Sequence, residues 1–510
     1  MDLQHQIGQH LIIGLQGIEL DNDFINAVKN YKIGNVILFS RNIKSKPQIK
    51  KLVNDIYQLY KKEVGITPFI TIDQEGGMVT RLNSDCINIP GAMALSATKN
   101  DEYIRKCTTL NIKQLKELNI NCNLAPVLDV NCNKDNPVIG VRSYSDNPKT
   151  VSDITNKVIK AYKDEKFLCV AKHFPGHGDT NLDSHLTLPT VNKDKKSLEK
   201  MELLPFKEAI KNGIPAIMTS HILYPTLESE NLPSTMSKTI ITDILRNQLG
   251  FEGLVFSDDM EMKAIKDFYG VAEGVIESLK AGADLMFISH HPKLAIEVSE
   301  KIKEEYNKGS FDKEMWDNSL KRILLFKEIY AEIKEKKNLT KDDKSYITKV
   351  KEKSVSLYKG KTYKLGNHPL FVSPNLFNAT NVSDDSEALS FTKELSKQFS
   401  SEYLICSSNP SKNEITSLCN KIKDMEITDI IFGSYNAHIY KGQENLIRAI
   451  KSKDIPLTVI ALRNPYDLKN VDDISDVSIA SYEYTKEMID IIEKILKQEI
   501  EITSKVPVSM

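Results

Sequence analysis

The stretch LCVAKHFPGHGDTNLDSHLTLPT (168–190) is the part of the chain around which the other motifs are organised. It begins as an apolar run, Leu168 to Ala171, which is typical of a buried strand, and then becomes polar and glycine-rich. The ionisable side chains that follow the run are Lys172, His173, His177, Asp179, Asp183 and His185. Because ionisable groups that crowd just past a buried strand usually carry chemistry, we expect the functional site here.

Three interpretations compete for this stretch. The first is a polar surface loop with solvated histidines. The second is a metal site, because His173 and His177 have the i, i+4 spacing that binds zinc on a helix; Pro175 and Gly176 between them argue against a helix. The third is acid–base chemistry by the Asp183–His185 pair, in which the carboxylate fixes the tautomer of the imidazole and raises its pKa. The residues favour the third interpretation.

The first 330 residues alternate short apolar runs with amphipathic stretches. The runs occupy residues 10–15, 35–40, 68–73, 122–130, 168–174, 216–222, 253–259 and 284–289. Continuous apolar strands that alternate with helices indicate a parallel sheet covered on both faces. Eight such units predict an α/β fold, a closed (β/α)8 barrel of the TIM type, with an open doubly wound sheet as the alternative.

Polar residues at one end of the predicted strands favour the barrel. They end or directly follow the apolar runs, at Asp73, Asp129, Lys172, His173, His221, Asp258 and His290. In a barrel the carboxyl ends of the strands converge on one rim, which is where such enzymes keep their active sites. Unrelated surface polar residues would not all fall at the same end.

The chain is too long for one ordinary core, and we expect three parts. They are a (β/α)8 catalytic barrel over 1–332, a charged connecting helix and linker over 333–362, and a smaller α/β sandwich-like domain over 363–510. The last part has neither GxGxxG nor GxxxxGK[ST], so no nucleotide is expected there. Its role is expected to be structural, or that of a wall over the barrel rim.

Composition limits the partners and the compartment. The formal net charge of −1 shows no basic excess that would suit nucleic acid or an anionic membrane. The seven cysteines are scattered without a CxxC pair, which is typical of buried thiols in a reducing compartment. The apolar run at 10–15 is too short for a signal peptide or a membrane span, so we expect a cytoplasmic protein, or a secreted one if the start is truncated.

Two further motifs carry candidate binding residues. Asp73 ends a strand in IDQEGGMVTRL, where its carboxylate suits two neighbouring sugar hydroxyls or an ion pair with Arg81. Arg142, in VIGVRSYSDN, presents a rigid fork of donors. We expect Arg142 either to grip a substrate or to pin its own loop to Asp129 or Asp135.

The run GLVFSDDMEMKAI (253–265) closes an apolar strand with two consecutive acids. Asp258 is expected to project toward the rim, where it suits a nucleophile, and Asp259 to interact with the start of the following helix. Adjacent side chains diverge, so the two acids are not expected to serve one reaction centre. His221 is expected near the rim, and His290 with His291 in a structural role.

Several motifs together resemble a known family. They are IDQEGG (72–77), GVRSY (140–144), KHFPGHGDTNLDSH (172–185), FSDDMEM (256–262) and ALRNPYDL (461–468). In this order they resemble the β-N-acetylglucosaminidase, or β-N-acetylhexosaminidase, branch of glycoside hydrolase family 3, the last motif matching the second domain of two-domain members. The resemblance covers nearly the whole chain. Met78 departs from it, because an arginine is common at that position.

The resemblance implies a retaining exo-glycosidase that removes terminal non-reducing β-linked N-acetylglucosamine from cell-wall (peptidoglycan) fragments. It assigns Asp258 as the nucleophile that forms a glycosyl–enzyme, and His185, held by Asp183, as the general acid and base. The positions that bind the sugar would be Asp73, Arg81, Arg142, Lys172 and His173, with His177 in the same motif. An unperturbed histidine pKa near 6.5 needs only a slight rise to keep a proton ready.

Three alternatives stay open. A histidine acid–base repels anions less than a carboxylate does, so phosphate in place of water would give a phosphorylase. A non-catalytic sugar-binding barrel is less consistent with the acids and the Asp183–His185 pair. A metal-dependent hydrolase is the third alternative. We expect a small carbohydrate or muropeptide as partner, and neither metal nor cofactor.

Overall fold

A closed barrel of eight parallel strands forms the first part of the chain. The computed structural model describes residues 1–82, 85–180, 187–375, 389–452 and 454–510. The strands are β1 (Leu11–Gly14), β2 (Asn35–Leu38), β3 (Ile70–Ile72), β4 (Cys122–Asn123), β5 (Leu168–Phe174), β6 (Ala216–Thr219), β7 (Leu254–Asp259) and β8 (Leu285–Ile288). Each apolar run expected to be a strand contains one, and β1 pairs with β8 to close the barrel instead of leaving an open sheet.

The barrel strands bury both faces, which explains their continuous apolar sequences. Successive side chains of a strand point to opposite faces. Ile12 therefore joins the cluster that fills the barrel interior with Phe256 and Phe287. Its neighbours Leu11 and Ile13 join the larger cluster that the strands share with the surrounding helices.

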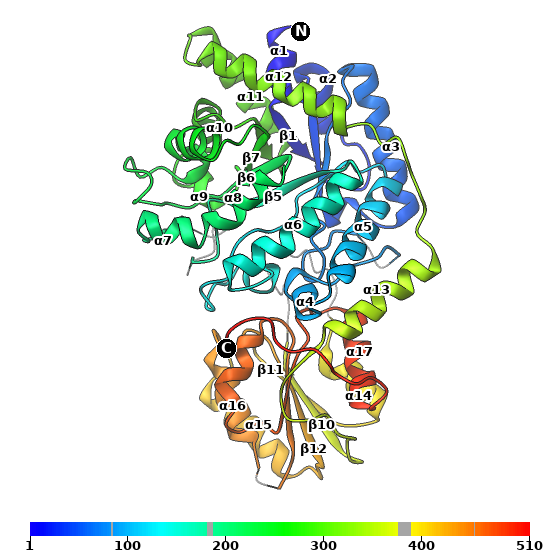
Figure 1. Ribbon diagram of the computed structural model, residues 1–510. Helices are drawn as coiled ribbons and strands as arrows, with labels where there is room; N and C mark the ends of the chain where they lie inside the picture. Colours follow the sequence, from blue (N-terminus) through cyan, green and yellow to red (C-terminus); the bar gives the residue numbers. More distant parts are fainter. Residues whose placement is uncertain (83–84, 181–186, 376–388, 453) are drawn as a thin grey trace.

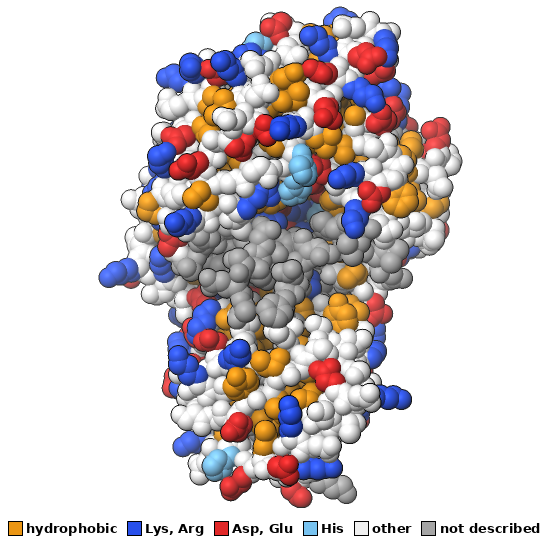
Figure 2. Space-filling view, turned by 180° about the vertical axis from the view of Figure 1, so that it is seen from behind, with side chains coloured by type: hydrophobic (Ala, Val, Ile, Leu, Met, Phe, Trp, Pro, Cys, Tyr) orange, Lys and Arg blue, Asp and Glu red, His pale blue; other side chains and the backbone are white. Residues whose placement is uncertain are grey.

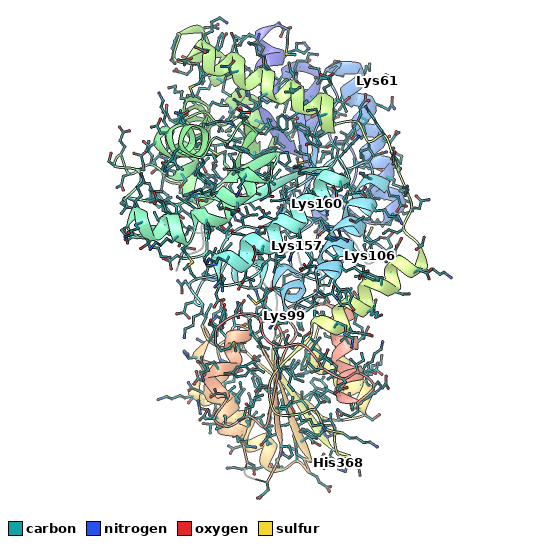
Figure 3. All side chains as sticks on the ribbon, in the orientation of Figure 1. Lys61, Lys99, Lys106, Lys157, Lys160 and His368 are labelled. Atoms are coloured by element: carbon teal, nitrogen blue, oxygen red, sulfur yellow. The ribbon has the colours of Figure 1, made fainter. Side chains whose placement is uncertain are left out.

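Helices follow the strands and cover the outside of the barrel (Figure 1). They include α2 (Asn22–Tyr31), α3 (Lys46–Glu63), α5 (Asp101–Glu117), α6 (Pro148–Asp164), α8 (Leu203–Lys211), η4 (Thr239–Gln248), α10 (Val271–Lys280) and α11 (Pro292–Asn307). In α3, Ser45 caps the first turn, and the buried residues recur every three or four positions. Lys61, Lys106 and Lys160 point outward from α3, α5 and α6 (Figure 3), as expected of solvated faces.

A second, mixed sheet of six strands follows, in the order β11-β10-β12-β13-β14-β9. Its strands are β9 (Ser356–Lys359), β10 (Pro369–Pro374), β11 (Tyr403–Cys406), β12 (Asp429–Ser434), β13 (Leu457–Ala461) and β14 (Val477–Ala480). In Figure 1, α15 (Lys412–Lys423) and α16 (Lys441–Ile450) lie on one side of this sheet and α14 (Phe391–Phe399) and α17 (Lys486–Leu496) on the other. This layering agrees with the expected smaller α/β domain.

The range expected to be only a helix and linker, 333–362, holds more structure than that. Helix α13 (Lys341–Ser354) lies where a connecting helix was expected. Strand β9 follows it and pairs with β14 in antiparallel register. Strand β9 could not be predicted from the sequence. It is an edge strand whose residues are mostly half-buried, and its partner β14 lies far along the chain.

The second domain packs against the loops at the carboxyl ends of β3 and β4. The Sδ atom of Met78 accepts a hydrogen bond from the Tyr484 backbone N–H at 3.1 Å, and Met78 belongs to the hydrophobic core of the second domain. The Val141 N–H donates to Asn464 Oδ1 at 3.0 Å. In Figure 2, basic and histidine side chains lie in and beside a hollow of the barrel domain, at its end nearer the second domain. The second domain thus holds the loops that rim the barrel.

Two ends of the barrel are distinct. The second domain covers the loops at the carboxyl ends of the strands, whereas α1 (Leu3–Gln9) and α12 (Lys313–Tyr330) lie at the opposite end (Figure 1). Among the described residues, no helix combines the length and the apolar character that a membrane crossing needs.

Candidate active site

A cavity of about 370 Å³ opens at the carboxyl end of the barrel. The expected site residues that line it are Asp73, Arg81, Arg142, Lys172, His173, His177 and Asp258. Strands β3, β5 and β7 therefore bring side chains from 73 to 258 together at one rim, as the barrel predicted. Asp183 and His185, the expected acid–base pair, lie outside the described residues.

Lys172 ends up at the centre of a buried charge cluster. Its Nζ lies 2.7 Å from Asp73 Oδ1 and 2.7 Å from Glu75 Oε1, and its side chain is only 3% exposed. Arg81 Nη2 lies 3.5 Å from the other oxygen of Asp73, so the expected ion pair of Asp73 with Arg81 forms. Two cations held on carboxylates present both donors and acceptors, which is the set that a polyhydroxylated substrate requires.

Glu75 is a site residue that was not predicted from the sequence. It binds Arg142 through two oxygens, at 2.8 Å from Nη2 and 3.0 Å from Nε, in addition to Lys172. Burial by itself would raise the pKa of Glu75, but Arg142 and Lys172 outweigh burial and hold the pKa far below its usual value. The signal in the sequence was the IDQEGG motif, in which Glu75 stands two residues after Asp73.

This pairing corrects the expectation that Arg142 would pin its loop to Asp129 or Asp135. The guanidinium of Arg142 grips Glu75 and also lines the cavity. Asp129 has different partners. One of its oxygens lies 2.6 Å from His173 Nδ1, and the other accepts hydrogen bonds from the backbone N–H groups of His173 and His177 at 3.2 and 2.6 Å.

Asp129 thereby fixes the orientation of the His173 ring. With a proton on Nδ1 directed at the carboxylate, Nε2 is the ring nitrogen that remains for a ligand in the cavity. Burial, and then the neighbouring His173, lower the pKa of His177 to about 4, so that His177 is neutral at pH 7. Its Nδ1 lies 3.0 Å from Thr180 Oγ1.

The metal-site interpretation gains no support from this arrangement. His173 is the second-last residue of β5, and the chain then turns through Pro175 and Gly176, so the two histidines do not share a helix. Their rings meet edge to face with centroids 5.7 Å apart. Within the described part of the chain, no group of three or more His, Cys, Asp or Glu side chains is arranged to hold a metal ion.

Asp258 lies near the end of β7 and lines the cavity, as expected. Its Oδ1 accepts a hydrogen bond from the Asp259 backbone N–H at 2.8 Å, which orients the carboxylate. Asp259 is not the N-cap of α9 (Lys263–Lys266), which is Met262, but the Asp259 carboxylate accepts a hydrogen bond from the Glu261 N–H at 3.2 Å in the turn just before that helix, close to what was expected of Asp259. Its carboxylate accepts from the Ser289 N–H at 3.3 Å and lies 3.3 Å from His290 Nε2, so it ties β7 to β8, and it lines the cavity too.

Two histidines, His221 and His290, lie close to these acids. His221 is buried near the rim, as expected, and its Nε2 lies 2.9 Å from the Asp259 carbonyl oxygen. His290 was expected to be structural only, but it lines the cavity beside Phe39, with ring centroids 5.1 Å apart, while its Nδ1 lies 3.1 Å from Arg41 Nη1. A residue that follows a barrel strand at the carboxyl end should have been counted with the site.

The fold and the site together define a barrel enzyme of the glycoside hydrolase class, with its site at the carboxyl ends of the strands. The chain belongs to glycosyl hydrolase family 3, whose N-terminal domain model matches residues 3–326. The resemblance seen in the motifs is thus confirmed at the level of the family.

Known proteins agree with this assignment. The chain is 39% identical over 282 residues to beta-hexosaminidase A of Pseudoalteromonas piscicida, an alignment that spans 52% of this chain but only 47% of that protein. It is 32% identical over 298 residues to a beta-hexosaminidase of Thiobacillus denitrificans, covering 57% of this chain and 81% of that one.

A solved structure matches both domains. The glycoside hydrolase family 3 beta-N-acetylglucosaminidase from Paenibacillus sp. str. FPU-7 superimposes with a TM-score of 0.91 at 31% identity, covering 100% of this chain and 99% of that chain. The second sheet is therefore part of an arrangement that this relative shares.

Proposed function

We propose that this protein is a retaining exo-β-N-acetylhexosaminidase that releases terminal non-reducing β-linked N-acetylglucosamine. The observation that carries the proposal is the position of Asp258 in a cavity whose other walls hold Asp73, Arg81, Lys172 and His173. A nucleophilic carboxylate faces a set of fixed donors and acceptors there, and the similar proteins are named for this activity.

The proposed reaction has two steps. In the first, the Asp258 carboxylate attacks the anomeric carbon, the glycosidic C–O bond breaks, and the leaving oxygen takes a proton from His185. In the second, a water oxygen attacks the anomeric carbon, the bond to Asp258 breaks, and His185 takes the proton from water. Two displacements at one carbon retain the anomeric configuration.

The roles of Asp183 and His185 rest on the motif that they occupy in the sequence. Asp183 would hold the imidazole in one tautomer and favour its protonated form. His185 lies close in sequence to His177, which faces Asp258 in the cavity wall. We therefore propose His185, on the strength of its sequence motif, as the general acid and base of the reaction at this site.

The natural substrates in this proposal are muropeptides, fragments of peptidoglycan that carry terminal N-acetylglucosamine, and the compartment is the cytoplasm. The barrel over 1–332 would carry out the chemistry. The domain over 363–510, joined through 333–362, would hold the rim loops through contacts such as the one between Asn464 and Val141.

Product analysis tests the reaction type. A muramyl disaccharide with a terminal N-acetylglucosamine is incubated with the protein, with and without phosphate, and the anomer released first is identified by NMR. We expect the β-anomer of free N-acetylglucosamine in both cases. The α-anomer would contradict retention, and a sugar 1-phosphate formed with phosphate present would identify a phosphorylase.

Substitution tests the assigned roles. Asp258→Ala is expected to abolish turnover, whereas Asp267→Ala, an exposed acid a few residues further on, is the matched control and should keep wild-type kcat. His185→Ala should slow substrates with poor leaving groups far more than activated aryl glycosides. Normal activity in Asp258→Ala, or equal losses on both substrate types in His185→Ala, would contradict the respective role.

A further inference from the structure

A second cavity, of about 300 Å³, lies at the end of the barrel opposite the active site. Its residues come from helices η4, α10 and α12 and from His10 and Ala283, which precede strands β1 and β8. Because these positions are at the amino ends of the strands, the cavity is separated from the active site by the whole packed barrel interior.

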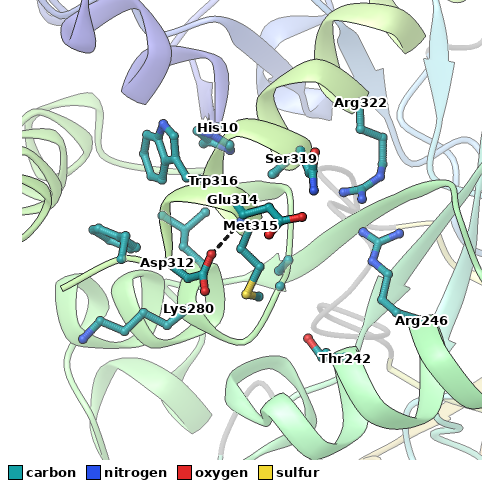
Figure 4. Close-up of a pocket in the computed structure, with 15 residues that line it drawn as sticks. His10, Thr242, Arg246, Lys280, Asp312, Glu314, Met315, Trp316, Ser319 and Arg322 are labelled. Atoms are coloured by element: carbon teal, nitrogen blue, oxygen red, sulfur yellow. Dashed lines mark hydrogen bonds between the residues drawn. The ribbon is translucent and has the colours of Figure 1, made fainter. Parts of the chain in front are cut away.

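A buried carboxylate with two arginines forms one wall. Asp284 is fully buried, and its two oxygens lie 2.7 Å from Arg246 Nη2 and 2.6 Å from Arg322 Nη1. Figure 4 shows the two guanidinium groups turned toward each other at one side of the cavity. Two half-buried cations thus share one anion, while the other charged residues of the lining are Lys280 and the exposed acids Asp312 and Glu314.

The arginines also have hydrogen-bond donors that are available to a ligand. The side chains of Arg246 and Arg322 are 13% and 22% exposed, and both line the cavity. The described residues satisfy only the Nη1 group of Arg322, through Asp284, so its Nη2 and Nε donors have no protein partner there. The pKa of Arg246 is lowered overall. Burial is the main cause, and the nearby Arg322 guanidinium also lowers this pKa, whereas the Asp284 carboxylate raises it.

The opposite wall carries aromatic side chains, with the exposed acids Asp312 and Glu314 near them in the chain. Trp316 and Phe311 line it with centroids 5.2 Å apart, and the Trp316 indole packs against His10 at 4.5 Å, as Figure 4 shows. The indole N–H already donates to Gln6 Oε1 at 3.0 Å and the buried ring also packs against Tyr306, so a ligand would contact only the part of the ring that lines the cavity. A cationic fork that faces an aromatic wall suits an anion attached to an apolar body.

We propose that this cavity is a second ligand site, which binds a small organic anion with its carboxylate or phosphate on Arg322 and Arg246 and its apolar part against Trp316 and Phe311. The volume is at the lower end of the range for small-molecule sites, about 300–1,000 Å³. The proposal is independent of the reaction proposed for the barrel rim.

The single tryptophan of the chain makes the site directly observable. Because Trp316 is the only tryptophan among the 510 residues, its fluorescence reports this cavity and no other place. The protein is titrated with 3-phenylpropionate, phenyl phosphate, inorganic phosphate and the neutral amide 3-phenylpropionamide. We expect a saturable emission change with at least one of the two aromatic anions and at least tenfold weaker binding of the amide.

Two variants of α12 separate a ligand site from a purely structural ion cluster. Arg322→Gln should weaken anion binding at least tenfold; it should still fold, because Arg246 and Ser319 keep Asp284 paired. Lys321→Gln removes the same charge from an exposed neighbouring position and should bind as the wild type does. Circular dichroism and Tm verify folding.

The outcomes decide the proposal. Preference for phenylpropionate identifies the headgroup as a carboxylate, and preference for phenyl phosphate identifies it as a phosphate. Three results would each overturn the proposal. They are an emission that does not change with either aromatic anion, an amide that binds as tightly as the anions, and a folded Arg322→Gln variant that binds the anions as the wild type does. Binding of inorganic phosphate as tight as that of phenyl phosphate would contradict the role of the aromatic wall.

Discussion

At Glu75, one carboxylate holds two of the cations that line the active site. Arg142 and Lys172 both approach it within 3.0 Å, yet Glu75 is not among the residues that line the cavity in the described structure. Glu75 is therefore a positioning residue, which acts on a substrate through the two cations. Both cations were predictable from their motifs, but their shared partner was not, because only the folded chain brings residues 75, 142 and 172 together.

The substitution Glu75→Gln tests this role. The amide keeps the shape but loses the charge that orients Arg142 and Lys172, so we expect kcat/KM to fall about a hundredfold, equivalent to about 2.7 kcal/mol, mainly through KM. Steady-state kinetics on an aryl N-acetylglucosaminide measures the change. The exposed Glu335→Gln is the matched control and should not change kcat/KM. An unchanged KM in Glu75→Gln would contradict a positioning role.

His177 predicts a pH dependence of stability. Its folded pKa of about 4 lies below the unfolded value of about 6.5, so between these values the unfolded chain binds more protons. The free energy of unfolding therefore rises with pH in this window, and the stabilisation, up to about 3 kcal/mol, is present above pH 6.5 and lost as the pH falls toward 4.

Urea unfolding at several pH values measures this dependence. His177→Gln should flatten the slope of the unfolding free energy between pH 4.5 and 6.5 relative to the wild type, because the titrating group is gone. His368→Gln removes an exposed histidine on the second domain (Figure 3) and should leave the slope as it is. Parallel curves for wild type and His177→Gln would show that His177 does not titrate in this way.

At the scale of helices and strands, an element could be predicted from the sequence where its local pattern of apolar residues was strong. The eight barrel strands were predictable because each is a continuous apolar run that is buried on both faces. Strand β9 was not, since its four residues sit in a charged region and its pairing with β14 depends on the folded second domain. Likewise, the role of Asp259 depends on Ser289 and His290, which reach it only when β7 and β8 pair.

A buried ion pair joins helix α13 to the second domain. Lys351 Nζ lies 2.7 Å from Glu483 Oε1 and 2.8 Å from Glu487 Oε2, and Lys351 and Glu483 are 0% and 1% exposed. Lys351→Met leaves Glu483 buried without its cation, which we expect to cost about 3 kcal/mol of unfolding free energy. Calorimetry should show a lower Tm.

A double substitution separates the pair from the packing. In Lys351→Met with Glu483→Leu the unpaired charge is removed, so most of the lost stability should return. Lys349→Met changes an exposed lysine on the same helix and should leave the Tm near the wild-type value. A Tm for Lys351→Met equal to that of Lys349→Met would show that the pair contributes nothing.

At the scale of the whole molecule, the second domain fixes the loop that carries Arg142. Gly140 lies directly against the second domain, because a Cβ atom on this residue would lie 2.3 Å from Asn464 Oδ1. Asn464 also accepts the Val141 N–H and donates to Asn436 Oδ1 at 2.9 Å, so it is held firmly. The sequence contained the motif around Arg142 but not its contact with the second domain, which joins residues more than 300 positions apart.

The substitution Gly140→Ala tests whether domain docking controls the site. The added methyl group must push Asn464 and the loop apart, and the positive φ of 46° adds strain of about 1 kcal/mol for a residue with a side chain. We expect Arg142 to shift and kcat/KM to fall at least tenfold, while circular dichroism shows a folded protein. Gly309→Ala carries similar strain, at φ of 78°, but its added Cβ meets nothing within 4 Å, so its activity should stay normal. Adding Asn464→Ala to Gly140→Ala removes the clash and should recover part of the activity. If Gly140→Ala and Gly309→Ala had equal activity, backbone strain alone, and not the contact between the domains, would determine the effect.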